Sequence, residues 1–466
     1  MVRNILVLAS LGLCIAGVAH AGERPQFQDR RFEEDWSVLL DEDLRTDFSD
    51  PIKFVPFDES GSVWASFGGQ LRERVEFWND FLFGGSMPDD DDVFLLHRLR
   101  IHGDLHVTER FRLFAELKSA LSTDRDLAGG KRQLDVDKAA LQNGFGELNL
   151  PLFGDLELRI RGGRQELLFG KERLVSPLDW ANTRRTFDGA TATFSAGDWA
   201  ATGFWTKPVH VHKHTANHSH EQNEFFGTYA TGRVPWVESL GLDLYWFGTH
   251  TKRATFNGTA GKEKRHTLGG RVWGALPGTA VEFDLEGAAQ VGSVSGRDIE
   301  ASMVALQLQY TPKDVPFAPT LGLGVDYASG DDEAGGEVGT FNQLFPLGHA
   351  YLGFLDFVGR QNIIDVHWTL AAKPIAKTVV KLDGHSFWRA DRDDALYNAG
   401  GGVARAGSLG NAKHVGYELD LTVKRPLVPH VVGVAGYSHF FAGSFIEQSG
   451  PDQDVDWSYL MLIVTF

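Results

Sequence analysis

Basic residues at alternate positions in one short stretch are the first indication of chemistry in this sequence. The stretch LLHRLRIHGDLHV, residues 95–107, carries Arg98, Arg100 and His102 at every second position with apolar residues between them. Alternate side chains of a β-strand point to opposite faces, so a strand here would have one polar, mostly basic face and one apolar face. The planar guanidinium of arginine binds carboxylates especially well. A single strand of this kind does not decide the fold, because the apolar face could meet a second sheet as well as lipid, and the question is whether the whole chain repeats the pattern.

The same alternation recurs in the segments 63–78, 110–121 and 156–162. On the polar faces of the four strands the sequence places eight basic residues, Arg72, Arg74, Arg98, Arg100, Arg112, Lys118, Arg159 and Arg161. The same faces carry four acids, Glu76, Asp104, Glu116 and Glu157. A positive excess of this kind inside a narrow channel favours anions. The alternative is that each arginine pairs with an acid across the strands and only braces the wall.

A second candidate site is the histidine-rich stretch HVHKHTANHSH, which contains His210, His212, His214, His218 and His220. Imidazoles two residues apart in an extended loop share a side and could bind zinc, copper or nickel. The alternative is a solvated loop, since no spacing here fixes a closed coordination geometry. The acidic runs 89–92 and 331–333 could bind calcium, although such runs are usually only solvated. We expect no cofactor other than a divalent cation at these loops.

An enzyme is the competing class of protein. The sequence contains no G-x-S-x-G, no H-E-x-x-H and no phosphate-binding glycine loop. His385 and Ser386 are adjacent, but neighbours in a strand point to opposite faces and cannot act on each other. We therefore expect a protein that is not an enzyme, with a barrel hydrolase as the less favoured alternative.

The elements that must position these residues are strands throughout. We count about 18 alternating segments, joined in turn by short connections such as 108–110 and 196–198 and long ones such as 168–185 and 330–359. This pattern predicts an all-β, transmembrane, antiparallel up-and-down β-barrel with short periplasmic turns and long extracellular loops. The chain ends on an apolar strand whose last residue, Phe466, is similar to an outer-membrane insertion signal. A soluble β-sandwich or propeller is the alternative fold.

Composition and the chain start agree with a protein that leaves the cytoplasm. Arg3, an apolar stretch and the triplet Ala19-His20-Ala21 predict a secretory signal peptide over residues 1–21, which includes the only cysteine. We expect an irregular N-terminal segment over 22–61 and the barrel over 62–466. The formal charge of −17 argues against a nucleic-acid partner.

Several long segments resemble the alginate export family of outer-membrane proteins. They include GGQLRERVEFWND, GRQELLFGKERLVSPLDWANTRRTFDGA and SFWRADRDDALYNAGG, and the match spans essentially the whole mature chain in order. The resemblance implies an 18-stranded barrel, and the founding member of the family passes the polyuronate alginate through an arginine-rich lumen. Five further basic residues lie in or near the matching stretches, where they would line the mouth: Arg164, Arg184, Arg185, Arg360 and Arg389.

The functional expectation is a channel in the outer membrane of a Gram-negative bacterium that passes an anionic solute. Export of an acidic exopolysaccharide, such as an alginate-like polyuronate, is the main hypothesis, and uptake of small anionic nutrients by a porin is the alternative. The expected partners are outer-membrane lipid and lipopolysaccharide, the anionic polysaccharide or small anion, and periplasmic export components.

Overall fold

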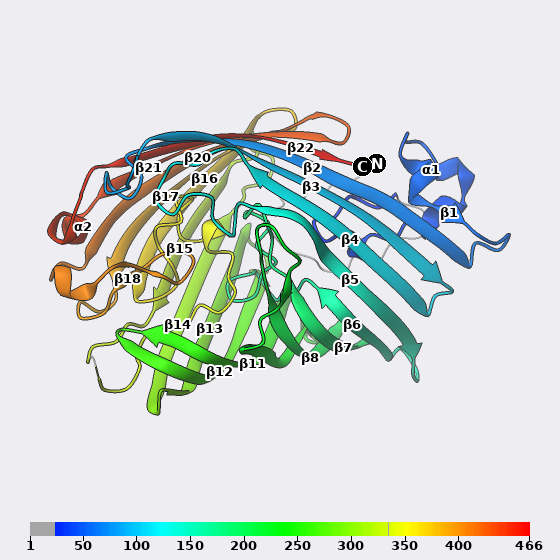
Figure 1. Cartoon of the computed structure of the whole chain (residues 1–466). Coiled ribbons are helices and arrows are strands. Elements are labelled where there is room, and N and C mark those ends of the chain that lie inside the picture. The colour runs from blue at the N-terminus through cyan, green and yellow to red at the C-terminus, as the bar shows by residue number, and fades with distance from the viewer. Residues whose placement is uncertain (1–23, 334) are drawn as a thin grey trace.

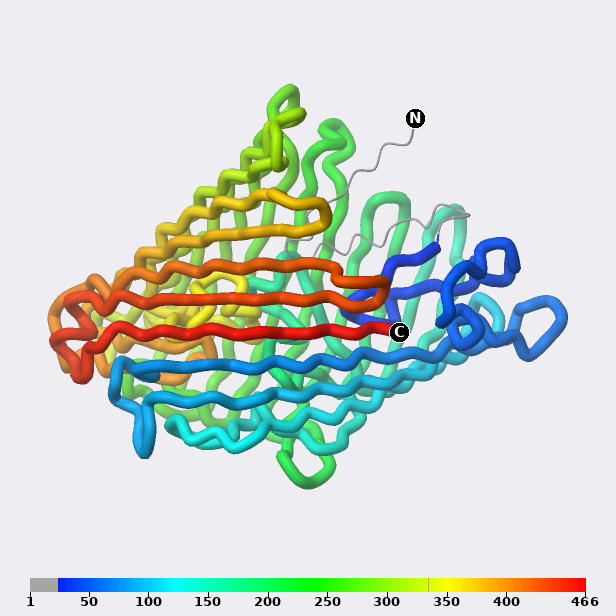
Figure 2. Tube along the Cα trace, turned by 90° about the horizontal axis from the view of Figure 1, so that it is seen from above, coloured from blue at the N-terminus to red at the C-terminus, as the bar shows by residue number. Residues whose placement is uncertain are grey.

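Eighteen long strands pair with their neighbours in chain order, and the last strand returns to the first. The computed structural model describes residues 24–333 and 335–466, so the predicted signal peptide lies outside the described residues. Strand β22 (Val455–Thr465) pairs antiparallel with β2 (Val63–Asn79), from Gln70 opposite Thr465 to Asn79 opposite Asp456. Figure 2 shows this closure, with the red C-terminal strand beside the blue first strand. The expected closed antiparallel barrel of 18 strands is confirmed.

The remaining strands of the wall follow one another around the barrel (Figure 1). They are β3 (Asp92–Val107), β4 (Phe111–Ser122), β5 (Asp137–Pro151), β6 (Glu157–Gln165), β7 (Phe187–Ala196), β8 (Trp199–His210), β10 (Asn223–Val234), β11 (Val237–Phe256), β12 (Thr259–Ala275), β13 (Val281–Val294), β14 (Arg297–Tyr310), β15 (Thr320–Ala328), β16 (Ile363–Ile375), β17 (Thr378–Arg389), β20 (His414–Val428) and β21 (Val431–Ala442). No helix in the described part of the chain is both long enough and apolar enough to span a bilayer.

The two-residue period of each strand sorts its side chains between the lumen and the outside. In β3, Arg98 and Arg100 are buried inside, whereas Ile101 on the opposite face is 51% exposed. Leucine, valine and aromatic side chains dominate the exposed positions of the other strands in the same way. An apolar outer surface of this kind suits contact with lipid, and the polar residues are gathered in the lumen.

Connections at the two ends of the barrel differ in length, with two exceptions. At the end that holds both termini of the barrel, the turns are short, for example 108–110 and 376–377. The opposite end carries the long connections 80–91, 166–186, 329–362 and 390–413. There, however, β11–β12 and β13–β14 are joined by the two-residue turns Asn257-Gly258 and Ser295-Gly296. All four of these residues have positive φ, as tight hairpins require.

The N-terminal segment, residues 24–61, closes on the barrel at the end with the short turns (Figure 2). It contains three 3-10 turns (Arg31–Glu33, Ser37–Leu40 and Glu42–Leu44), helix α1 (Asp50–Lys53) and strand β1 (Val55–Pro56). Arg31 donates to the backbone oxygen of Phe466 at 3.2 Å, and His430 contacts Asp47 at 2.7 Å. Phe32 packs edge-on against Phe145 of β5, with ring centroids 5.3 Å apart. The segment therefore reaches into the lumen from this end.

Two long loops also fold inward, 166–186 and 329–362. Val175 of the first forms a parallel bridge with Phe345 of the second, and Trp180 stacks on His349 at 3.8 Å. The remaining short elements lie in loops: β9 (His218–Ser219), β18 (Leu396–Tyr397), β19 (Val403–Arg405), helix α2 (Ser444–Ser449) and 3-10 turns at Gly348–Ala350 and Gly407–Leu409. The lumen is thus filled from both ends by segments that belong to this same chain.

Candidate functional site: the charged lumen

Five of the eight predicted basic residues of the wall form ion pairs with acids of the wall itself. The pairs are Arg74–Glu76 at 2.8 Å, Arg100–Glu116 at 3.0 Å, Arg112–Asp104 at 2.5 Å, Arg161–Glu147 at 2.5 Å and Lys118–Asp137 at 3.0 Å. Glu147 and Asp137 belong to β5, which the count on four strands did not include. These five cations brace the wall, and their charges are largely neutralised where they stand.

The other three, Arg72, Arg98 and Arg159, have no acid partner on the wall among the described residues. Arg72 donates to three backbone oxygens of loop 166–186, those of residues 179, 180 and 181, at 2.7 to 3.2 Å. Arg98 donates to the backbone oxygen of Asp179 at 2.9 Å and to its carboxylate at 2.7 Å. Arg159 is exposed and forms no ion pair with any described residue. These three arginines are the cations of the wall that an anion could neutralise.

Asp179 occupies the centre of a cluster of guanidinium groups. Its carboxylate contacts Arg98 and Arg184, and Arg184 also binds Glu166 at 2.7 Å and Asp29 of the N-terminal segment at 2.9 Å. Burial alone would raise the pKa of Asp179, but the surrounding arginines hold it well below its usual range. The carboxylate is therefore ionised at neutral pH, and it sits where a carboxylate of another molecule could sit.

The opposite side of the lumen is acidic. Strands β11 to β20 direct nine buried acids inward: Asp243, Glu263, Asp284, Glu286, Asp326, Asp365, Asp383, Glu418 and Asp420. Several are neutralised by arginines, as where Arg271 binds Asp243 at 2.7 Å and Arg173 binds Asp284 at 2.7 Å. The predicted basic lumen is thus only one wall, β2 to β6, and it faces a wall of the opposite charge. Fields of opposite sign on facing walls can orient a charged solute between them.

The arginines expected at the mouth have separate positions. Arg184 belongs to the cluster around Asp179, and Arg185 donates to backbone oxygens of both inward loops, including Ser176 at 3.0 Å. Arg360 pairs with Asp326 of β15, and Arg389 holds loop 390–413 through five backbone oxygens. These contacts fix loops, and all four side chains are buried or nearly so.

The sequence places Arg164 at the mouth of the lumen, but its side chain lies on the outer face of β6. Strand β6 continues to Gln165, so Arg164 keeps the alternation and lies on the face of Leu158 and Ile160, opposite the inward Arg161. It forms a bidentate ion pair with Asp188 of β7 at 2.7 Å. Because β6 extends to Gln165, the alternation of the strand places the Arg164 side chain on its outer face.

The histidine-rich stretch brings four of its five imidazoles together beside β8. Nε2 of His212 lies 2.9 Å from Nε2 of His218, and the His210 ring lies 4.6 Å from that of His212 and 5.6 Å from that of His220. His214 is exposed. Within the described residues, this loop does not bring three potential ligand atoms within 4.8 Å of one another, and a metal here stays a prediction.

Sequence reasoning did not identify the acids that complete the basic cluster. Asp29, Glu166 and Asp179 lie in the N-terminal segment and in loop 166–186, and no periodic pattern marks them. The excess of basic over acidic residues on the four strands indicates that such acids exist, because buried cations require partners from elsewhere in the chain.

A closed 18-stranded barrel with a charged lumen and an apolar outer face defines the class of outer-membrane channels. The chain belongs to the Alginate export family, whose model matches residues 63–457.

Solved structures of similar fold are porins of Pseudomonas aeruginosa. OccK3 (OpdO) superposes with a TM-score of 0.55 at 13% identity, covering 86% of this chain and 95% of that chain. OccD3 (OpdP) gives a TM-score of 0.58 at 10% identity, covering 89% of this chain and 93% of that chain. No curated protein sequence matches this chain at a significant level. At these identities the likeness concerns the fold.

Proposed function

We propose that this channel passes an anionic solute that carries carboxylates, and that its use is the export of an acidic exopolysaccharide such as an alginate-like polyuronate. The observation that carries the proposal is the position of Asp179. A carboxylate of the protein's own loop rests between Arg98 and Arg184, in a site built for that group.

The contacts of this carboxylate describe how a solute would compete with it. Among the described residues, Arg72 and Arg98 have no acid partner on the wall. If loop 166–186 moves away, both side chains therefore lose their present partners and are left without a counter-ion. A solute carboxylate would restore their partners, since a buried charge without a counter-ion is costly. Arg159 on β6 would offer the solute a further cation. Loop 166–186 and the solute would therefore bind to Arg72 and Arg98 alternately.

Export of a polymer and uptake of a small anion differ in the length of the solute. Membership of the Alginate export family supports a polymer. The filled lumen supports the alternative of a small anion, because two loops and the N-terminal segment must all give way before a long chain can enter. For either solute we place the barrel in the outer membrane, in contact with lipid and lipopolysaccharide, with periplasmic export components as partners in the first case.

Single channels in planar bilayers test the proposal. We expect an anion-selective reversal potential in a salt gradient, and current block by uronate oligomers but not by neutral oligosaccharides of the same length. Substitution of Arg98 and Arg159 by glutamine should weaken both effects. Block by neutral and acidic oligomers alike, or cation selectivity, would contradict the proposal. Block by small dicarboxylates without any effect of long uronates would favour the uptake alternative.

A further inference from the structure

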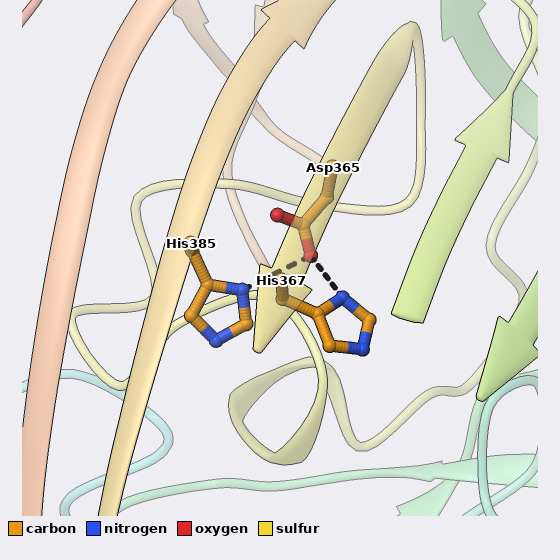
Figure 3. Close-up of side chains that lie close together, drawn as sticks. All are labelled: Asp365, His367 and His385. Atoms are coloured by element: carbon orange, nitrogen blue, oxygen red, sulfur yellow. Dashed lines mark hydrogen bonds and ion pairs between the residues drawn. The ribbon is translucent and has the colours of Figure 1, made fainter. Parts of the chain in front are cut away.

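A second cluster with ligand chemistry lies on the acidic wall, apart from the basic cluster described above. Asp365 and His367 of β16 and His385 of β17 direct their side chains toward one another (Figure 3). Nδ1 of His367 lies 2.9 Å from Oδ2 of Asp365, and Nδ1 of His385 lies 3.0 Å from the same oxygen. All three potential ligand atoms lie within 4.8 Å of one another. We propose that these three residues bind a divalent transition metal ion, with Zn²⁺ as the best-suited ion.

The donor set and its spacing fit such an ion. Two imidazoles and one carboxylate form a borderline set that zinc, copper and nickel accept, whereas calcium and magnesium require oxygen ligands. Zinc bonds of about 2.0 to 2.2 Å place tetrahedral ligand atoms about 3.3 Å apart. The two observed separations of 2.9 and 3.0 Å are close to that value. Small side-chain movements would therefore open the site to an ion, with a water molecule or a fourth residue completing the shell.

The strand register builds the cluster from directly opposed positions. His367 pairs with His385 across β16 and β17, and its other neighbour in the sheet is Gly324 of β15. A Cβ atom on Gly324 would overlap the imidazole of His367, so the glycine makes room for this ring. Asp365 lies opposite Asp326, whose carboxylate is 3.8 Å from Nδ1 of His367. Asp326 is thus placed to approach the same ion.

The electrostatics of the surroundings favour a cation. Asp365 is fully buried, and its Oδ1 has no hydrogen-bond partner among the described residues. Glu418 and Asp420 on the next strand are also fully buried, and neither forms an ion pair with a described lysine or arginine. Arg360 and Lys381 are engaged with Asp326 and Asp383. The imidazoles of His367 and His385 are the ion-pair partners of Asp365. A divalent ion bound between these groups would add positive charge beside buried carboxylates and so reduce the cost of burying them.

The position of the site suggests what the ion would do. Asp365 is the third residue of β16, directly after the inward loop 329–362, and Arg360 connects the end of that loop to Asp326. An ion held by β16 and β17 would fix the anchor point of this loop in the wall. The site is separate from the histidine-rich stretch, which lies beside β8 on another part of the barrel.

Metal content of the purified protein tests the inference. We expect the detergent-solubilised barrel, stripped with a chelator and incubated with Zn²⁺, to retain one tightly bound ion, and Co²⁺ to give the visible absorption of a nitrogen-ligated site. H367A, H385A and D365N should each weaken binding by about 100-fold or more, because loss of an outer-shell partner alone typically costs 10- to 100-fold. The matched control is the H212A/H218A double variant, which should keep the tight ion.

Two further measurements keep the test decisive if a variant fails to assemble. A difference in gel-electrophoretic mobility between unheated and heated samples reports whether each variant forms the barrel. X-ray absorption on the zinc-loaded wild-type protein should show two imidazoles and at least one oxygen ligand. The inference is overturned if the wild type retains no ion, if the ion is lost in H212A/H218A, or if assembled H367A and H385A bind as tightly as the wild type.

Discussion

Arg98 on β3 donates two hydrogen bonds to Asp179 of the inward loop, one to its backbone oxygen at 2.9 Å and one to its carboxylate at 2.7 Å. The two hydrogen bonds have different effects on the loop and on the charge of the wall. The backbone contact holds the loop against the wall. The carboxylate contact neutralises a guanidinium that has no acid partner on the wall within the described part of the chain. The loop therefore blocks the basic wall both by its bulk and by its charge.

Replacing Asp179 with asparagine separates these two effects. The amide can still lie against Arg98, but the negative charge between Arg98 and Arg184 is gone. We expect D179N to shift the reversal potential toward stronger anion selectivity, most clearly at low salt where screening is weak. The control is D124N, which removes an acid paired with Lys131 at the surface. Equal shifts in both variants would show that net charge alone is responsible.

Arg100 and Arg159 lie on the same wall and should respond differently to charge reversal. Arg100 and Glu116 are both fully buried and paired at 3.0 Å, and breaking such a pair costs about 3–5 kcal/mol. We expect R100E to lower the temperature at which the barrel loses its folded mobility in gel electrophoresis. R159E should leave that temperature nearly unchanged and reduce anion selectivity, because Arg159 is exposed and forms no ion pair with any residue that the structure describes. The opposite ranking would mean that the available cation has been misidentified.

The barrel followed from the sequence because its signal is repeated many times. A single stretch such as 95–107 is ambiguous, but the same alternation in about 18 segments leaves few other folds. The direction of each side chain on β2 to β4 followed for the same reason, since register fixes the face of every residue. Glu73 interrupts the apolar face of β2, and it lies directly opposite His97 of β3. Its Oε1 lies 2.5 Å from Nδ1 of His97.

The residues that fill the lumen could not be predicted from the periodicity of the sequence. Loops 166–186 and 329–362 have no period, and their folding inward depends on contacts such as Val175 with Phe345, 170 residues apart in the chain. The cluster of Asp365, His367 and His385 was missed because two of its members are 18 residues apart on neighbouring strands. The register that places His367 opposite His385 is set by the whole hairpin. Local motifs carry no information of this kind.

We expect the docking of the inward loop 166–186 to depend on pH through Glu172. Burial raises the pKa of Glu172 to about 7, and the nearby charge of Asp29 adds to the rise. The hydrogen bond that Ser176 donates at 2.6 Å, and the charges of Arg30 and Arg184, stabilise the ionised carboxylate and partly oppose the rise. A carboxyl whose pKa is raised stabilises the docked loop fully below about pH 4.5, and this contribution is lost as the pH rises to about 7. We expect conductance to increase over this range.

The conductance of E172Q should not change between pH 4.5 and 7, because the amide cannot ionise. Bilayer recordings of the wild type and E172Q at the same series of pH values provide the comparison. If both proteins show the same pH profile, another group controls the response and Glu172 does not regulate the loop.

Phe466 closes the barrel, and its removal should impair assembly. Its backbone nitrogen and oxygen pair with Gly69 of β2 at 3.0 and 2.8 Å, so the last residue completes the seam between the final and first strands. Its ring lies over Gly69, where a Cβ atom would clash, and its backbone oxygen accepts from Arg31. Deleting Phe466 removes all of these contacts, together with the terminal aromatic of the strand. We expect a several-fold lower yield of heat-modifiable barrel in the outer-membrane fraction, whereas F466Y, which keeps the backbone and an aromatic ring, should assemble like the wild type. Equal yields of the deletion and the wild type would mean that the seam forms without its last residue.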